Sequence, residues 1–241
     1  MAKNILVTGS SKGLGLVITT RLLAEGYSVI SINRTISEPL AELSKTYSDR
    51  LRILLFDLEN PDKLNSFFKD NISFDTPLHG FVNNAAIAYD DLVTNLRIES
   101  LEQMFRVNVF SPMILTKLVI RHMLFHKIEG SLVHLSSVSV HTGYKGLAMY
   151  ASTKGALEAF SKNTAREWGE RGIRSNCVVA GFMETAMSAG LQPGQLNRIF
   201  ARNALKKPVS LESVADTASF LIGEGSSSIT AQNIFVDNGT I

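Results

Sequence analysis

The sequence predicts a doubly wound α/β fold, in which about seven parallel strands form one sheet between layers of helices. Short apolar runs alternate with longer helical patterns along all 241 residues, which is the order that βαβ units require. The runs are continuous in Val, Ile and Leu instead of alternating with polar residues, so burial on both faces of each strand is expected. Because no linker or repeat interrupts this order, we expect residues 1–241 to form a single domain.

The individual elements follow from these runs and from the punctuation between them. Asn60 precedes Pro61, and proline is favoured at the first position of a helix. The segment 182–203 contains several apolar side chains but no strand pattern, and we expect it to cover the substrate, with simple core packing as the alternative. Strands are predicted at 4–8, 28–32, 52–56, 80–83, 131–136, 175–179 and 233–236. Helices are predicted at 13–25, 40–47, from 60 onward, and at about 100–126, 151–168 and 211–222.

Composition excludes several classes of function. The 24 Lys and Arg residues nearly balance the 22 Asp and Glu residues, so there is no global positive field for a nucleic-acid partner, and a local basic patch is the open alternative. Cys177 is the one cysteine, so no intrachain disulfide is expected. No apolar stretch approaches ~18 residues and no signal peptide is evident, so we expect a cytoplasmic protein without membrane contact. His122 and His126 lie four residues apart but lack an evident third ligand, and no metal site is expected.

A glycine-rich turn follows the first strand. Gly9, Gly13 and Gly15 would let the chain turn sharply and bring backbone N–H groups at a helix start close to a phosphate. The pattern predicts a nucleotide site, with an ordinary tight turn as the alternative. The same residues match the G-x-S-x-G elbow of hydrolases around Ser11. That interpretation is disfavoured for two reasons. No earlier strand precedes Ser11, and the triad needs a histidine downstream of its acid, whereas the last histidine in the chain is His141.

The end of the second strand predicts which dinucleotide is bound. An acidic residue there would bond the 2′-hydroxyl of NAD, whereas a basic one accommodates the 2′-phosphate of NADP. The sequence has Asn33 and Arg34 at this point, and Lys12 in the glycine turn is a second cation. We therefore expect NADP(H) in preference to NAD(H), with two solvated surface cations as the alternative.

A tyrosine and a lysine lie four residues apart at a predicted helix start. Tyr150 and Lys154 would share one helix face. A cation ~4 Å from the phenol contributes roughly 4 kcal/mol at a dielectric of ~20, which lowers the pKa by about 3 units before desolvation offsets part of it. Ser137 ends the fifth strand, and ligands of such folds bind at the carboxyl ends of strands. The three side chains are therefore predicted to meet over one site for acid–base chemistry.

Together these motifs resemble the short-chain dehydrogenase/reductase family in its single-domain form, over essentially the whole chain. The matching features are the glycine turn, Asp57-Leu58 after the third strand, Asn83-Asn84-Ala85-Ala86 with Ala86 in place of glycine, Asn108 in a helix, and the set Ser137, Tyr150 and Lys154. The resemblance implies a Rossmann fold. It also implies cofactor contacts from Gly9, Ser11, Lys12, Gly13, Leu14, Gly15, Asn33, Arg34, Asp57, Leu58, Asn84, Ala85, Ala86, Tyr150, Lys154, Gly181, Met183 and Thr185.

The resemblance also implies a catalytic role for each of four residues. Tyr150 would protonate a carbonyl oxygen as hydride arrives, and Ser137 would hydrogen-bond that oxygen. Lys154 would lower the pKa of the tyrosine and bind the nicotinamide ribose. Asn108 would hold a water that connects Lys154 to solvent, although it could instead merely bend its helix. Besides Ala86, three positions depart from the family pattern: Ala180 replaces a proline, Ala231 replaces a glycine, and Asn238 replaces a glycine.

The resemblance favours an NADPH-dependent carbonyl reductase similar to the 3-oxoacyl-[acyl-carrier-protein] reductases of fatty acid biosynthesis. A 3-oxoacyl thioester is the expected substrate. Arg171 is a candidate contact for an acidic carrier protein, with a solvated surface arginine as the alternative. A reductase of a sugar, a polyketide or another secondary alcohol is an open alternative, because loops set the substrate. A catalytically idle, NADP-binding regulatory protein is a further alternative. The family resemblance suggests a homotetramer or homodimer.

Overall fold

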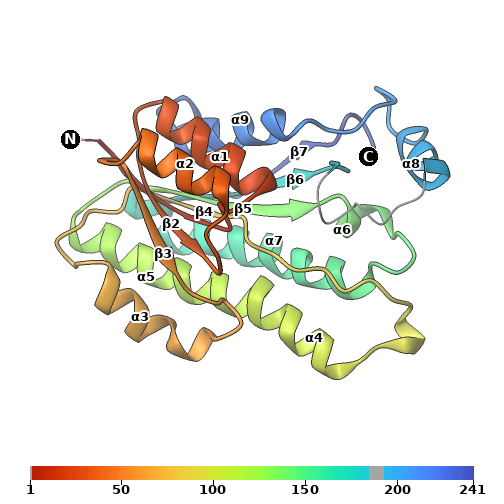
Figure 1. Ribbon diagram of the computed structural model, residues 1–241, viewed down its shortest axis with the longest axis horizontal. Coiled ribbons are helices and arrows are strands. Elements are labelled where there is room, and N and C mark those ends of the chain that lie inside the picture. The colour runs from red at the N-terminus through yellow and green to blue at the C-terminus, as the bar shows by residue number, and fades with distance from the viewer. Residues whose placement is uncertain (1, 185–192) are drawn as a thin grey trace.

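The computed structural model describes residues 2–184 and 193–241, and its centre is one parallel sheet (Figure 1). The strands are β1 (Asn4–Thr8), β2 (Ser28–Asn33), β3 (Leu51–Leu55), β4 (Gly80–Asn83), β5 (Ser131–Ser137), β6 (Arg174–Ala180) and β7 (Asn233–Val236). Their order across the sheet is β3-β2-β1-β4-β5-β6-β7, and every neighbouring pair is parallel. The predicted doubly wound fold is therefore confirmed.

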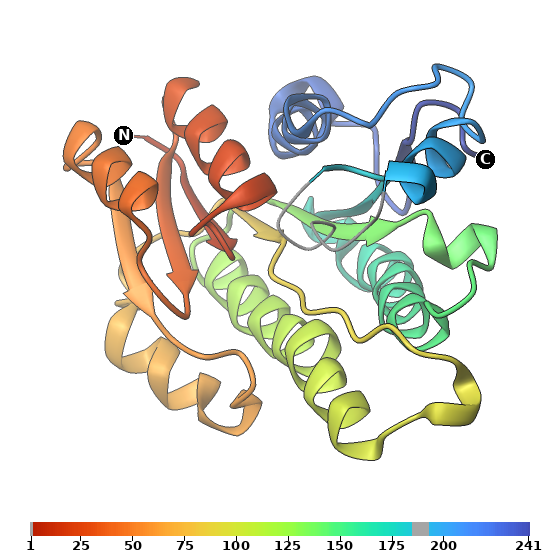
Figure 2. The ribbon, with the colours of Figure 1, turned by 45° about the vertical axis from the view of Figure 1, so that its right-hand side comes forward.

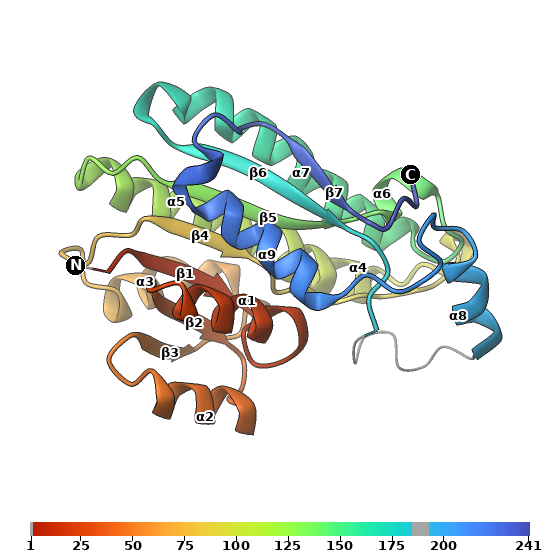
Figure 3. The ribbon, with the colours of Figure 1, turned by 90° about the horizontal axis from the view of Figure 1, so that it is seen from above.

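Helices cover both faces of this sheet. The helices are α1 (Gly13–Ala24), α2 (Glu38–Thr46), α3 (Leu64–Asn71), α4 (Ile98–Phe105), α5 (Ser111–Phe125), α6 (Ser139–Thr142), α7 (Ala148–Trp168), α8 (Pro193–Phe200) and α9 (Leu211–Ile222). Figure 3 looks onto the face that carries α1, α2 and α9, and Figure 1 shows α3, α5 and α7 on the opposite face. Two apolar cores result, one on each side of the sheet.

Burial on both faces explains why the strands read as continuous apolar runs. Ile5 and Val7 of β1 belong to the core under α1 and α9, whereas Leu6 between them belongs to the core under α3 and α5. All three side chains are fully buried. Successive residues of a strand point to opposite faces, so a strand covered on both faces has no polar position to alternate with.

Two of the predicted helices contain turns that are not α-helical. The long helix expected at about 100–126 consists of α4 and α5, joined without a break by a π-helical turn over Arg106–Phe110. The helix expected to begin after Asn60 starts as a 3₁₀ turn, Pro61–Lys63, before α3. The short helices α6 and α8 were not predicted. None of the helices in the described part of the chain is both long and apolar enough to cross a membrane.

The sheet order places a crevice at the carboxyl ends of the strands. β1 pairs with β2 on one side and β4 on the other, so the chain passes in opposite directions from this point and the loops after β1 and β4 separate. Ligands of open α/β sheets bind at such a switch point. Figure 2 shows α6, α8 and the C-terminus together on one side, away from the N-terminus.

Candidate functional site

A cavity of about 570 Å³ lies at the carboxyl ends of the strands. The predicted residues on its lining are Gly9, Ser11, Lys12, Leu14, Gly15, Asn33, Arg34, Asp57, Leu58, Asn84, Ala85, Ala86, Tyr150, Lys154 and Met183. Four predicted residues, Gly13, Asn108, Ser137 and Gly181, are not part of that lining. Thr185 lies outside the described residues. Predicted residues from six separate stretches of sequence thus converge on one cavity.

The glycine turn after β1 has the geometry of an anion cradle. Gly9 and Gly13 have φ values of +75° and +57°, a region that suits glycine. A Cβ on Gly15 would lie 2.0 Å from the carbonyl oxygen of Gly9, so no other residue fits there. Lys12 occupies the N-cap position of α1, but its side chain makes no capping hydrogen bond. The first N–H groups of the helix are therefore available to a ligand. The backbone of this turn therefore fits a pyrophosphate.

The end of β2 carries a polar atom that is buried without a partner. Asn33 donates from Nδ2 to Ser31 Oγ at 2.6 Å, whereas its Oδ1 has no hydrogen-bond partner within the described residues. Lys12 and Arg34 are exposed at the edge of the cavity. The ion pairs of residues 2–184 and 193–241 include neither of them. The Asn33 oxygen without a partner, together with the Lys12 and Arg34 cations outside any of these ion pairs, fits a nucleoside that carries a phosphate.

Lys154 is buried and turned toward the sheet. Its exposed fraction is 3%, its Nζ donates to the carbonyl oxygen of Leu135 at 2.7 Å, and burial lowers its pKa to about 8. The Nζ lies 5.7 Å from the centre of the Tyr150 ring. An ammonium has three N–H donors, so two remain for groups that enter the cavity, which Lys154 lines.

The predicted lowering of the Tyr150 pKa is wrong for the chain by itself. Burial of the phenol, the larger cause, and the negative charge of Asp90 together raise the pKa of Tyr150 to about 12. The lysine does not offset this shift, because its ammonium is turned to the Leu135 carbonyl. Tyr150 therefore keeps its proton at neutral pH, which suits an acid more than a base.

The Ser137 hydroxyl can still donate one hydrogen bond. Its Oγ accepts hydrogen bonds from the backbone N–H of Ser139 at 3.2 Å and from Ser139 Oγ at 3.0 Å. A serine hydroxyl has one donor and two acceptor sites. Since both acceptor sites are filled, the remaining O–H is free to donate, which is what a carbonyl oxygen of a substrate requires.

Asn108 joins three segments of the chain. It is fully buried within the π-helical turn. Its Oδ1 accepts from Ile87 N at 2.9 Å, and its Nδ2 donates to Ile87 O at 2.8 Å and to Thr153 Oγ1 at 3.1 Å. The side-chain amide thus holds the loop after β4 against α7. Because both amide protons are used, a water held by Asn108 would bond to its main-chain oxygen.

Several lining residues were not predicted. Ser37 caps α2 by accepting from Leu40 N and donates to the carbonyl oxygen of Ser11; a serine before Glu38-Pro39 is a readable capping signal. The others have no residue type that marks a site. The unpredicted lining residues are Ile32, Thr35, Ser37, Phe56, Ile87, Val107, Leu135, Ser136 and Ala180.

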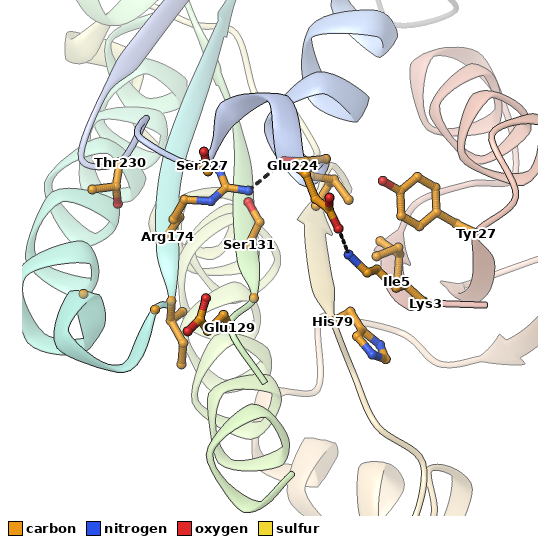
Figure 4. Close-up of a pocket in the computed structure, with 16 residues that line it drawn as sticks. Lys3, Ile5, Tyr27, His79, Glu129, Ser131, Arg174, Glu224, Ser227 and Thr230 are labelled. Atoms are coloured by element: carbon orange, nitrogen blue, oxygen red, sulfur yellow. Dashed lines mark hydrogen bonds and ion pairs between the residues drawn. The ribbon is translucent and has the colours of Figure 1, made fainter. Parts of the chain in front are cut away.

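A second cavity, of about 470 Å³, lies at the amino ends of the strands (Figure 4). Arg174 donates there to the carbonyl oxygens of Leu221 at 2.9 Å and Gly223 at 3.0 Å, and to Ser226 Oγ at 2.9 Å. These bonds satisfy the carboxyl end of α9. The guanidinium is therefore committed to the fold, and nothing in this cavity points to a ligand.

Two other candidates from the sequence have structural partners. His122 Nδ1 lies 3.2 Å from the carbonyl oxygen of Thr76, and His126 Nε2 lies 2.8 Å from that of Phe74. Among the residues that the structure describes, no group of three or more His, Cys, Asp or Glu side chains could hold a metal. Each histidine is thus tied to the main chain.

The region of Arg171 is not uniformly basic. A Cβ on the neighbouring Gly172 would lie 2.3 Å from the Glu129 side chain, so that carboxylate lies directly against this turn. Glu170 also precedes Arg171 in the same 3₁₀ turn. An acidic partner would meet two carboxylates beside the one arginine.

Comparisons with known proteins show which family and fold this chain shares. A family model described as enoyl-(acyl carrier protein) reductase matches residues 9–240. The chain is 31% identical to carbonyl reductase [NADPH] 2 of Sus scrofa, over 97% of this chain and 94% of that protein. It is 30% identical to the 3-oxoacyl-[acyl-carrier-protein] reductase FabG of Escherichia coli, over 98% of this chain and 96% of that protein. A solved structure of ElxO with NADP bound is 25% identical and superposes with a TM-score of 0.89, over 100% of this chain and 99% of that one.

Proposed function

Since this chain belongs to the short-chain dehydrogenase/reductase family of oxidoreductases, we propose that it reduces a ketone with NADPH and that Tyr150 protonates the carbonyl oxygen. The observation that carries this proposal is the convergence of an open anion cradle, a protonated tyrosine and a buried lysine on one cavity. A nicotinamide cofactor, when bound, supplies the hydride. All other contributions come from side chains of the chain itself.

Four side chains divide the work of the reduction. With a pKa near 12, Tyr150 holds its proton until negative charge develops on the carbonyl oxygen. Ser137 donates its remaining O–H to the same oxygen. Lys154 has two unspent N–H donors for the ribose and for the phenol once it has given up its proton. Asn108 keeps the loop after β4 at a fixed place relative to α7.

The cofactor preference follows from charge at the adenosine end. A 2′-phosphate would lie near Lys12 and Arg34, which have no carboxylate partner in the described chain. No acidic residue stands at the end of β2 to bond a free 2′-hydroxyl. NADPH is therefore proposed over NADH. A mammalian relative named for its NADPH dependence and a neighbour with NADP bound support the same choice.

The substrate class has two candidates. A 3-oxoacyl thioester is proposed first, because FabG proteins are among the relatives. A small free ketone, such as that of a sugar, is the second, because Glu129 and Glu170 beside Arg171 weaken a docking site for an acidic carrier protein. In both cases the segment 182–203, of which residues 185–192 lie outside the described part of the chain, is proposed to contact the substrate. Assembly as a homodimer or homotetramer and a cytoplasmic location stay predictions.

Turnover of a carbonyl panel tests the proposal. The purified chain should oxidise NADPH in the presence of a 3-oxoacyl thioester or a small ketone, and Tyr150→Phe should lower kcat by about 10³-fold. NADPH should bind to the Tyr150→Phe variant with a Kd within about twofold of the original. If no carbonyl compound in a broad panel is turned over, the enzyme proposal fails and the idle cofactor-binding alternative stands.

Affinity for the two cofactors tests the cation argument separately. Arg34→Ala combined with Lys12→Ala should weaken NADPH binding by about 10- to 100-fold, as expected for loss of two charge-assisted bonds, and leave NADH binding unchanged. Fluorescence titration measures both constants. Equal affinities of the original chain for NADH and NADPH would contradict the assignment.

A further inference from the structure

A buried carboxylate lies behind the proposed reacting groups. Glu158 is on α7, one helical turn beyond Lys154, and is 6% exposed. Its carboxylate accepts from Ser136 Oγ at 2.5 Å and from Asn233 Nδ2 at 2.7 Å, and lies 3.1 Å from His141 Nε2. Burying an ionised carboxylate is costly unless its acceptor sites are filled. Here Ser136 and Asn233 donate to them and the His141 ring lies within hydrogen-bond distance, so the three partners come from β5, β7 and α6.

Two of these bonds enclose Ser137. Ser136 and His141 lie on either side of the turn that contains Ser137 and Ser139, and both bond to the one Glu158 carboxylate. Inside the turn, Ser137 Oγ is already held by Ser139. The end of β5 and the start of α6 are therefore fixed at both sides to α7, the helix that also carries Tyr150.

We infer that Glu158 is a positioning residue, which sets the place of the Ser137 hydroxyl relative to the Tyr150 hydroxyl. The inference rests on the proposed function, in which both hydroxyls bond to one carbonyl oxygen. Two donors serve one oxygen only when each lies ~2.7–3.1 Å from it, and a misplacement of about 1 Å can cost ~10²-fold in rate. No atom of Glu158 belongs to the cavity lining, so its effect passes through Ser136 and His141.

Kinetics of three variants test this role. Glu158→Leu removes all three bonds and should lower kcat by about 10- to 100-fold, with the Kd for NADPH within about twofold of the original. Ser136→Ala removes one bond without burying an unpaired charge, and should lower kcat by about 10-fold. Glu158→Gln keeps an acceptor for Ser136, and rotation of the Asn233 amide would offer it the buried Oδ1 that now lacks a partner in the described chain. This conservative variant should recover most of the lost kcat.

Ser161→Ala is the matched control. Ser161 lies on the same helix and shares a buried hydrogen bond with Ser175 at 2.8 Å, away from the Ser137 turn. The Ser161→Ala variant should lose about as much stability as Ser136→Ala, and its kcat should equal that of the original chain. An equal loss of kcat in Ser161→Ala, or a kcat within twofold of the original in both Glu158→Leu and Ser136→Ala, would overturn the inference.

Hydrogen exchange separates this inference from the proposed function, because it needs no turnover. Amide exchange measured by mass spectrometry should accelerate in residues 137–142 in Glu158→Leu and stay unchanged in β1 and α1. Unchanged exchange in residues 137–142 would overturn the positioning role even in an active enzyme. Faster exchange there in a chain that turns over no carbonyl compound would uphold the role of Glu158 in holding the turn while the proposed function fails.

Discussion

The two ends of the sheet carry cavities of similar size whose polar groups are used very differently. At the carboxyl ends of the strands, Asn33 Oδ1 lacks a partner among the described residues, and α1 begins without a side-chain cap. At the amino ends, Arg174 donates hydrogen bonds to the carbonyl oxygens at the end of α9, and Lys3 forms an ion pair with Glu224 at 2.7 Å. The volumes, about 570 and 470 Å³, do not separate the two.

The difference shows that unsatisfied hydrogen-bond donors and acceptors, more than cavity volume, mark a binding site in this molecule. Polar groups that are buried without partners lower the stability of the chain alone. A ligand that forms hydrogen bonds with them recovers that free energy. Groups that are fully paired contribute to the fold and have nothing left to offer. The carboxyl end should therefore tolerate substitutions in stability but not in activity, and the amino end should show the reverse.

Lys154→Met should give the largest effect at the carboxyl end. Loss of the buried ammonium should lower kcat by about 10³-fold, because the donors proposed for the ribose and for the deprotonated phenol are then absent. The same variant should be about 1–2 kcal/mol more stable at pH 7, because a pKa lowered to about 8 by burial means that the charged form costs free energy in the folded state. Steady-state kinetics and urea unfolding measure the two effects. A variant that is both inactive and strongly destabilised would contradict the contrast.

The pH dependence of that stability has a definite sign. The pKa of Lys154 is about 8 in the folded chain, below its ordinary value of 10.5. Between these values the unfolded chain binds one more proton, so the original chain gains stability by up to about 1.4 kcal/mol per pH unit as the pH rises. The advantage of Lys154→Met should therefore shrink steadily above pH 8. A constant advantage from pH 7 to 10 would show that the lysine is not desolvated.

Arg174→Met should give the opposite result at the amino end. The substitution leaves the carbonyl oxygens of Leu221 and Gly223 without their donor and should destabilise the chain by about 2–4 kcal/mol. The kcat per folded molecule should stay within about twofold of the original. Arg174→Lys is a useful control, since one ammonium can replace only part of the guanidinium fork. A fall in kcat without a fall in stability would place a ligand in this cavity.

The fold could be predicted because its signals are local. The run 4–8 matches β1 residue for residue, and the glycine turn lies where the strand–helix junction requires it. The π-helical turn at Arg106–Phe110 was missed, because it depends on bonds from Asn108 to Ile87 and Thr153. Those three residues come from distant parts of the chain, and no periodic pattern reports such a contact.

The electrostatics of the site could be predicted only in part. The sequence placed Tyr150 and Lys154 on one helix face, and both line the same cavity. The sign of the tyrosine pKa shift was wrong, because it depends on burial of the phenol and on where the ammonium turns. Spacing along a helix reports which side chains are neighbours, whereas desolvation depends on every element packed around them.

Ala231→Gly should give the smallest effect, and it tests the amino end in the stabilising direction. Ala231 immediately follows Thr230, which lines the second cavity, and it has φ +60° while its N–H donates to Ser175 O at 2.8 Å. A left-handed conformation costs an alanine ~1–2 kcal/mol, and the extra freedom of glycine in the unfolded chain returns ~0.4–1 kcal/mol. The variant should therefore be about 0.5–1 kcal/mol more stable in urea unfolding, with unchanged kcat. Ala159→Gly, in the exposed middle of α7, should instead lose about 1 kcal/mol, and equal losses in both variants would show that the backbone at Ala231 is not strained.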